Sequence, residues 1–207
     1  MKIKHLPFAL ICLASCTMDN PSTQPGILTT TAASLSSAPA VAESSPEKTV
    51  REYLNWYSTH YDKLPTNLVK YPTSHDPSGY YAVDFHATES WLTSVRESGL
   101  LSEGYLQHWR SYFKQYADTM RLHHQNDGPA PGFEYDFLML SQEADTKLTE
   151  LQAGIFTTRL VSGTSATVAA LGPQHDGWRE GMTFELTKSA TGQWQIETMS
   201  IPDNLIQ

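Results

Sequence analysis

The side chains best suited to chemistry gather between residues 123 and 136. His123, His124 and Asp127 come first, and Glu134 and Asp136 follow at alternate positions of the segment GFEYD. Imidazole nitrogens and carboxylate oxygens together can hold a divalent cation. The alternative is a solvated loop, stiffened by the prolines and glycines of GPAPG. We favour the loop, and we assign no metal ligand and no cofactor to the chain.

Carboxylates continue beyond this segment and form a second candidate site. Glu134, Asp136, Glu143 and Asp145 lie close together in the sequence and are flanked by glycine and proline. Gln142, Glu143 and Asp145 are expected on the exposed face of a helix. Dense carboxylates steer basic partners towards a surface, so this stretch is the predicted edge for a protein partner.

The overall charge agrees with a basic partner. The chain has 14 basic and 22 acidic residues and a net charge of −8. If a leader carrying Lys2 and Lys4 is removed, 12 basic residues stand against 22 acidic ones, a net charge of −10. An acidic surface disfavours nucleic acid and anionic lipid headgroups, so we expect no nucleic-acid partner.

The sequence contains none of the common catalytic signatures. There is no Gly-x-Ser-x-Gly elbow, no glycine-rich nucleotide-binding pattern and no His-Glu-x-x-His zinc motif. No catalytic residue is assigned on this basis.

The N-terminus has the features of a targeting segment. Lys2 and Lys4 precede the almost wholly apolar residues 6–14, a run shorter than the roughly 20 residues of a membrane-spanning helix but typical of a signal peptide. The following Leu13-Ala14-Ser15-Cys16 resembles the lipobox of bacterial lipoproteins. A plain secretory signal with an incidental cysteine is the alternative.

The lipobox resemblance implies residues 1–15 as a lipoprotein signal peptide and lipidation of Cys16. Thr17 stands where an aspartate would favour retention at the inner membrane. The resemblance thus implies an outer-membrane lipoprotein that faces the periplasm and contacts the membrane through its N-terminal lipid. Cys12 would leave with the leader, so the mature chain would have neither a free thiol nor a disulfide.

Residues 16–45 are predicted to be a lipidated cysteine and a flexible tether. They are rich in Ser, Thr and Ala and contain no aromatic residue, so they cannot bury enough apolar surface to fold. Residues 46–207 are long enough for a single domain with a sizeable core.

The domain is expected to begin with three helices. Ser44-Ser45-Pro46-Glu47 is a helix start, residues 62–79 form a long loop, and residues 80–85 alternate as a short strand. Thr88 is expected to cap the second helix, which Gly99 ends, and Ser102 to cap the third.

Aromatic residues recur along the third helix at helical spacing. Tyr105, Trp109, Tyr112 and Tyr116 form the stripe, which favours a core position. Because their hydroxyls need hydrogen-bond partners, the pattern also suggests a polar-lined cavity beneath them.

The C-terminal part alternates as β-strands. Strands are predicted at 155–161, 166–171, 182–188 and 194–201, with turns at Gly163-Thr164 and Thr191-Gly192. Helices followed by an antiparallel meander indicate an α+β fold, with three N-terminal helices packed on a curved four-stranded antiparallel sheet.

Four segments resemble a bacterial envelope family of unknown function with the cone-shaped fold of nuclear transport factor 2. They are TVREYLNWY, YAVDFHATESWLTSVRESGLLSEGYLQHWRSYF, NDGPAPGFEYDFLMLSQEAD and GQWQIETMSI. The resemblance implies the cone fold across nearly the whole domain, but no chemistry, because that fold serves isomerases, dehydratases, immunity proteins and binding modules.

Enzymes of the cone fold often use an Asp or His base with tyrosine donors. Asp84 and Tyr57 would suit those roles, although Asp84 also fits an outward position on a half-buried strand. The candidate pocket residues are Tyr57, Tyr81, Asp84, Tyr105, Trp109 and Tyr112.

We expect a non-enzymatic, lipid-anchored binding module in the periplasm. Its ligand would be a small molecule or a basic protein. Two alternatives stay open: an immunity protein that neutralises a periplasm-acting toxin, and an enzyme of the isomerase or dehydratase type.

Overall fold

The computed structural model describes residues 44–73 and 79–202. The leader, Cys16 and nearly all of the predicted tether lie outside these residues. The helices are α1 (Pro46–His60), α2 (Phe85–Glu97), α3 (Glu103–Leu122) and α4 (Ala144–Gln152), with a 3₁₀ turn η1 (Tyr61–Lys63). The strands are β1 (Val69–Lys70), β2 (Ala82–Val83), β3 (Ile155–Ser162), β4 (Ser165–Leu171), β5 (Gly181–Lys188) and β6 (Trp194–Ser200).

The four-stranded antiparallel sheet is confirmed. Its strand order is β3-β4-β5-β6, and each strand begins and ends within one residue of its predicted bounds. Alternate residues of β4 are buried, among them Ala166, Val168 and Ala170. The helices α1 and α4 supply this burial: α1 packs against β3, β4 and β6, and α4 packs against β4 and β5. The α+β class is therefore confirmed.

Three predicted helix boundaries are confirmed by their capping contacts. Ser45 caps α1, and its side chain accepts a hydrogen bond from the Lys48 backbone N–H at 3.2 Å. Ser102 caps α3 in the same way through the Tyr105 N–H at 3.0 Å. Gly99 follows α2 with a φ of +70°, the left-handed conformation that glycine adopts readily at a helix end.

The predicted strand at residues 80–85 is too long. Only Ala82 and Val83 pair with β1, and α2 begins directly afterwards, capped by Asp84 and not by Thr88. The Asp84 carboxylate accepts hydrogen bonds from the His86 and Ala87 N–H groups. These bonds satisfy the first donors of a helix, so they end the alternating pattern at Asp84. Phe85 is consequently 52% exposed and does not face the core.

Residues 44–73 and 79–202 contain four α-helices, whereas three N-terminal helices were expected to pack on the sheet. The additional helix α4 buries Leu148 and Leu151 and packs against α1. Asp145 lies on α4 and is exposed, as predicted, and Glu143 is the residue before the helix. An exposed helix face was expected at residues 142–145, but the helix was not counted among those that cover the sheet, because it is short and carries only two large apolar residues.

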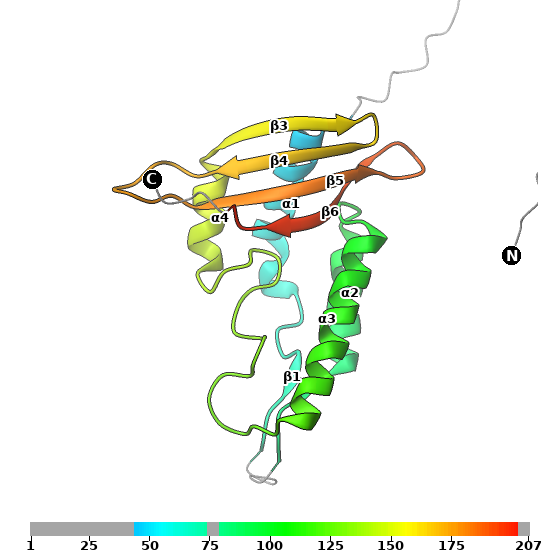
Figure 1. The fold of residues 1–207 in the computed structure, drawn as a ribbon, viewed down its shortest axis with the longest axis vertical. Helices are drawn as coiled ribbons and strands as arrows, with labels where there is room; N and C mark the ends of the chain where they lie inside the picture. Colours follow the sequence, from blue (N-terminus) through cyan, green and yellow to red (C-terminus); the bar gives the residue numbers. More distant parts are fainter. Residues whose placement is uncertain (1–43, 74–78, 203–207) are drawn as a thin grey trace, which may run out of the picture. The chain divides into compact units, whose positions relative to one another are not determined.

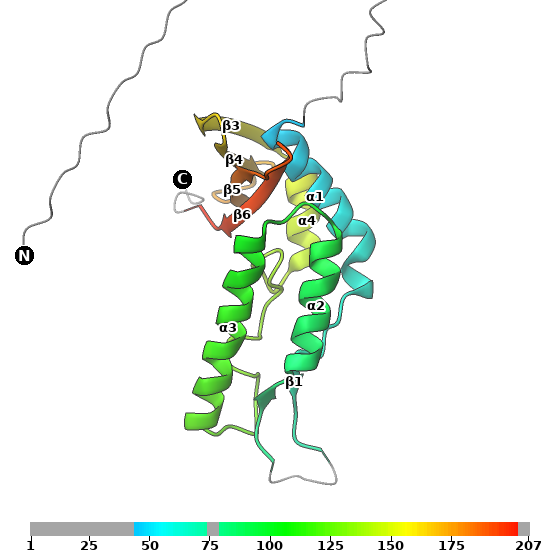
Figure 2. The same ribbon diagram turned by 90° about the vertical axis from the view of Figure 1, so that its right-hand side faces the viewer.

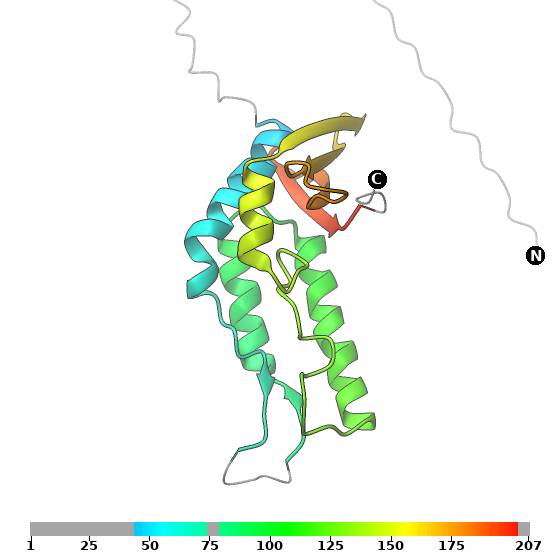
Figure 3. The ribbon, with the colours of Figure 1, turned by 90° about the vertical axis from the view of Figure 1, so that its left-hand side faces the viewer.

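The segments that form the candidate site run alongside α2 and α3. These two helices pack against each other and extend away from the β6 edge of the sheet (Figures 1 and 2). The chain returns from the end of α3 as a long segment, residues 123–143, that leads to α4 (Figure 3). Among the described residues, no helix has the length and apolarity needed to cross a membrane.

Candidate functional site

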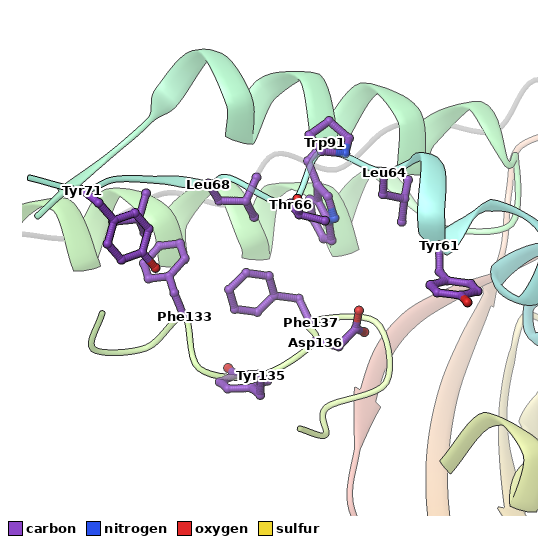
Figure 4. A pocket seen from close by; sticks show the side chains of 12 residues that line it. Tyr61, Leu64, Thr66, Leu68, Tyr71, Trp91, Phe133, Tyr135, Asp136 and Phe137 are labelled. Atoms are coloured by element: carbon purple, nitrogen blue, oxygen red, sulfur yellow. The ribbon is translucent and has the colours of Figure 1, made fainter. Parts of the chain in front are cut away.

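A cavity of about 220 Å³ lies between two loop segments and α2. One wall comes from residues 61–71, which follow α1, and another from residues 133–137 (Figure 4). Trp91 of α2 closes the space behind them. Six of its lining residues are aromatic: Tyr61, Tyr71, Trp91, Phe133, Tyr135 and Phe137. We call this cavity the aromatic pocket.

Asp136 supplies the carboxylate in the described lining of the aromatic pocket, and three donors hold it. Oδ1 accepts hydrogen bonds from the backbone N–H groups of Leu138 and Met139 at 2.8 and 2.7 Å. Oδ2 accepts a hydrogen bond from the Tyr57 hydroxyl at 3.0 Å. The backbone N–H of Asp136 donates to the Ser141 carbonyl at 2.9 Å. The side chain is therefore fixed in one position.

The surroundings of Asp136 disfavour its charged form. Burial raises the pKa of its carboxyl, and the charge of Asp145 acts in the same direction, while the hydrogen bonds from Met139, Tyr57 and Leu138 lower it. Burial, followed by the charge of Asp136, raises the pKa of the Tyr57 hydroxyl. Titratable groups with shifted pKa values in a pocket mark candidate functional sites.

Tyrosine hydroxyls from α1, from α3 and from the residue before β2 hold the segment that carries Asp136. Besides Tyr57, Tyr53 of α1 donates to the Leu138 carbonyl at 2.7 Å, and Tyr81 donates to the Gly128 carbonyl at 2.7 Å. Tyr112 of α3 donates to the Gly132 carbonyl at 2.8 Å. All four partners lie between residues 123 and 143. Of the tyrosines predicted to line a pocket, Tyr57, Tyr81 and Tyr112 use their hydroxyls to position this segment.

The residues proposed from the sequence as one pocket do not meet around a single cavity. Tyr57 contacts Asp136 at the aromatic pocket, whereas Tyr105 and Trp109 are buried in the core. The Trp109 ring packs behind the pocket wall, with its centroid 4.8 Å from that of Phe137. Asp84 caps α2 and lies 3.6 Å from Lys70. Tyr81 and Tyr112 donate hydrogen bonds to the Gly128 and Gly132 carbonyls.

The predicted partner edge separates into two parts. Glu134, Glu143 and Asp145 are exposed, whereas Asp136 is half-buried and its carboxylate accepts hydrogen bonds from Leu138, Met139 and Tyr57. The residues considered as candidate cation ligands are likewise not gathered: among the described residues no group of three or more His, Cys, Asp or Glu side chains could hold a metal ion. His124 instead stacks on Tyr80, with ring centroids 4.3 Å apart.

The backbone is strained close to Asp136. Leu140 has a φ of +51°, and among the described residues it is the non-glycine residue with positive φ. This conformation costs about 1 kcal/mol or more for such a side chain, and it persists where surrounding contacts enforce it. Here the Asp136–Ser141 backbone pairing encloses Leu140.

A second hollow lies between β2 and α3. It has a volume of about 690 Å³ and is lined by Tyr80, Tyr81, Val83, Met120, Arg121 and His124, among others. We call it the β2–α3 groove. Its volume is larger than that of the aromatic pocket, but its charged residues Lys114, Asp118 and Arg121 are exposed, and no carboxylate in its described lining is held by backbone donors as Asp136 is. The aromatic pocket is therefore the better candidate site.

Sequence reasoning identified Asp136 but not the rings around it. Phe133, Tyr135 and Phe137 alternate with Glu134 and Asp136, and this alternation of aromatic and acidic side chains was the available signal. Trp91 carried no signal, because its place on the buried face of α2 is equally typical of a core residue.

Comparison of the chain with protein-family models, with characterised proteins and with solved structures gave no match.

Proposed function

We propose that this protein is a non-enzymatic binding module that takes a small ligand in the aromatic pocket. One observation carries the proposal: a single fixed carboxylate, Asp136, faces a cavity with predominantly aromatic walls. Ligand sites are typically apolar cavities with a few fixed polar groups that orient the ligand. The tyrosine hydroxyls that hold residues 123–143 keep the site formed in advance, which reduces the entropy lost on binding.

The size of the pocket limits the ligand. Its volume of about 220 Å³ exceeds the ~150 Å³ of an engineered cavity that binds benzene and is smaller than the roughly 300–1,000 Å³ typical of drug-sized ligands. By proportion, the ligand has about nine non-hydrogen atoms. Tyr61 and Tyr71 are 42% and 51% exposed and leave the pocket accessible from solvent.

The proposed setting of this module follows from the N-terminal sequence. The lipobox resemblance at Cys16 supports a lipid-anchored protein of the outer membrane that faces the periplasm. A sheet covered on one face by helices is compatible with the cone fold of nuclear transport factor 2, which we propose for the domain.

Binding is favoured over catalysis by the contacts of the two candidate carboxylates. A general base works together with a partner acid, but the described lining of the aromatic pocket contains no His, Lys or second carboxylate beside Asp136. Asp84 caps α2 and is paired with Lys70. Tyr57 donates its hydroxyl proton to Asp136 and so does not direct it towards a substrate.

A pocket-filling substitution tests the proposal. Thr66 lines the pocket and is exposed, while its neighbour Asn67 is exposed and lies outside the lining. Thr66→Phe should obstruct the pocket, and Asn67→Phe is the matched control. The measurement is saturation-transfer NMR of the full chain with small neutral, cationic and anionic compounds of about nine non-hydrogen atoms or fewer.

The parent chain and Asn67→Phe should bind the same compounds, and Thr66→Phe should lose them. Either of two results would contradict the proposal: no compound binds the parent chain, or Thr66→Phe binds as the parent does.

A further inference from the structure

The negative charge of Asp136 in the aromatic pocket is not compensated by a positive charge in the described lining. Asp136 is the pocket's only carboxylate, and among the described lining residues none is Lys, Arg or His. The donors that hold Asp136 are two backbone N–H groups and one hydroxyl, all of them neutral. Neutral donors offset only part of the free energy lost when a carboxylate leaves water. A positively charged group bound in the pocket would compensate the charge of Asp136.

Asp136 has room for one more donor. A carboxylate offers about four acceptor positions. Oδ1 receives two hydrogen bonds and Oδ2 receives one, so one position on Oδ2 remains. Figure 4 shows this carboxylate next to Phe137, between the segment 133–137 and the segment that follows α1. A donor bound in the pocket can reach it.

The walls of the pocket also attract cations. The face of an aromatic ring carries partial negative charge, and cages of such rings recognise alkylammonium ions. Six aromatic residues line the pocket, and Figure 4 shows Phe133, Tyr135 and Phe137 on one side with Trp91 opposite. Apolar carbon atoms of a ligand gain from the same rings through burial.

From these observations we infer that the ligand of the aromatic pocket is a small organic cation, an alkylammonium ion whose charge lies against Asp136 and whose carbon atoms contact the rings. This inference rests on the proposed function and names its ligand class. A bare metal ion fits poorly, because it needs several oxygen ligands and the pocket offers one carboxylate. An organic anion would be repelled by Asp136. The net charge of −8 additionally steers cations towards the chain.

Two matched pairs of ligands test this inference on the full chain. Choline is compared with neohexyl alcohol, in which a carbon atom replaces the charged nitrogen, and butylammonium is compared with butyl alcohol. Dissociation constants are measured by NMR titration. Each cation should bind at least about tenfold more tightly than its uncharged partner, the range expected of a desolvated cation–π contact supported by a carboxylate.

Two variants connect the preference to Asp136. Asp136→Asn keeps an oxygen acceptor for the Leu138 and Met139 N–H groups but removes the charge, and should lower the preference for cations to about threefold or less. Asp145→Asn removes an exposed charge of the same sign outside the pocket lining, and should leave the preference unchanged. A full preference in Asp136→Asn would overturn the inference.

The remaining outcomes separate the ligand class from the function. If the cation and the uncharged compound of each pair bind equally well, and Thr66→Phe abolishes both, the inferred ligand class is wrong but the proposed binding function is supported. If neither pair of ligands binds, or if Thr66→Phe does not affect their binding, the pocket does not bind an alkylammonium ion. The wider set of compounds then tests whether the pocket binds any small ligand. A capped tripeptide with a central lysine must bind less tightly than butylammonium, because tighter binding would assign the cation to a partner's side chain.

Discussion

At the scale of single residues, Asp136 combines a structural role with the proposed binding role. Its oxygens fix the turn at Leu138 and Met139, and its charge faces the aromatic pocket without a basic neighbour in the described lining. An amide of the same shape can fulfil the first role, but only the carboxylate can fulfil the second. A buried charge that serves binding lowers the free energy of unfolding, and this effect can be measured.

Asp136→Asn should leave the protein at least as stable as the parent at pH 7. Burial raises the pKa of Asp136 above 3.8 in the folded chain. The folded state therefore keeps a proton that the unfolded state loses, and stability falls as pH rises through this window. The stability advantage of the variant should grow above pH 3.8 and then become constant, as measured by urea unfolding. A loss of more than about 1 kcal/mol at pH 7 would show that folding needs the charge.

Gly132 tests how tightly residues 123–143 are held. It has a φ of +79°, and an added Cβ would lie 2.1 Å from a ring atom of Tyr116. Gly128 has a similar φ of +73°, but its nearest atom would be 3.7 Å away. Gly128→Ala should cost about 1 kcal/mol for its backbone conformation, and Gly132→Ala at least about 1–3 kcal/mol more for the clash. Equal losses in thermal unfolding would mean that Tyr116 moves aside easily.

Burial of the Lys147 ammonium group lowers the free energy of unfolding by an amount that depends on pH. Lys147 is 2% exposed on α4, and burial lowers the pKa of its ammonium group, partly opposed by Glu180. The cost is complete below the folded pKa and disappears as pH approaches 10.5, at about 1.4 kcal/mol for each unit by which the pKa is lowered. Lys147→Met should therefore be more stable than the parent at pH 7, with an advantage that shrinks towards pH 10. A constant or growing difference in urea unfolding would be inconsistent with this explanation.

At the scale of elements, local signals could be predicted and distant contacts could not. Ser45 and Ser102 cap their helices through residues three positions away, and the strands of the meander are joined in sequence order. The aromatic pocket depends instead on Tyr57 and Tyr53, which bond residues 79 and 85 positions away. Periodicity shows that such tyrosines are buried, but it does not show which segment receives their hydroxyls.

The N-terminus of α2 provides a test of Asp84. Asp84→Ala should cost about 1 kcal/mol, because the His86 and Ala87 N–H groups lose their acceptor. Asp84→Asn retains the cap and removes only the charge opposite Lys70, whose ammonium group is largely exposed, so its cost should stay below about 0.5 kcal/mol. Thermal unfolding measures both. Neither variant should alter the affinity for butylammonium, and a loss of binding in Asp84→Asn would place Asp84 in the site.

At the scale of the whole molecule, the proposed function combines a membrane anchor with a pre-formed pocket. A lipid on Cys16, separated from the domain by the Ser- and Thr-rich residues 17–45, would hold the module at the membrane, since several acyl chains on one residue give durable attachment. The domain itself contributes the acidic charge and the pocket. Attachment and binding should therefore be separable by mutation.

Cys16→Ser should release the protein into the soluble periplasmic fraction without changing the affinity of the pocket. Cys12→Ser is the matched control, because Cys12 precedes the expected cleavage point and its loss should leave the protein in the membrane fraction. Fractionation followed by immunoblotting measures both. Membrane association of the Cys16→Ser protein would contradict the lipobox interpretation.

The central claim, that the aromatic pocket is the binding site, is tested most directly by mapping backbone amide shifts during a butylammonium titration. The Leu138 and Met139 amides donate to Asp136, so a cation at that carboxylate should shift both signals, together with the indole N–H of Trp91 in the pocket wall. The account predicts that the largest shifts cluster on these three groups. Largest shifts at Ala117 and Arg121 of the β2–α3 groove would contradict it.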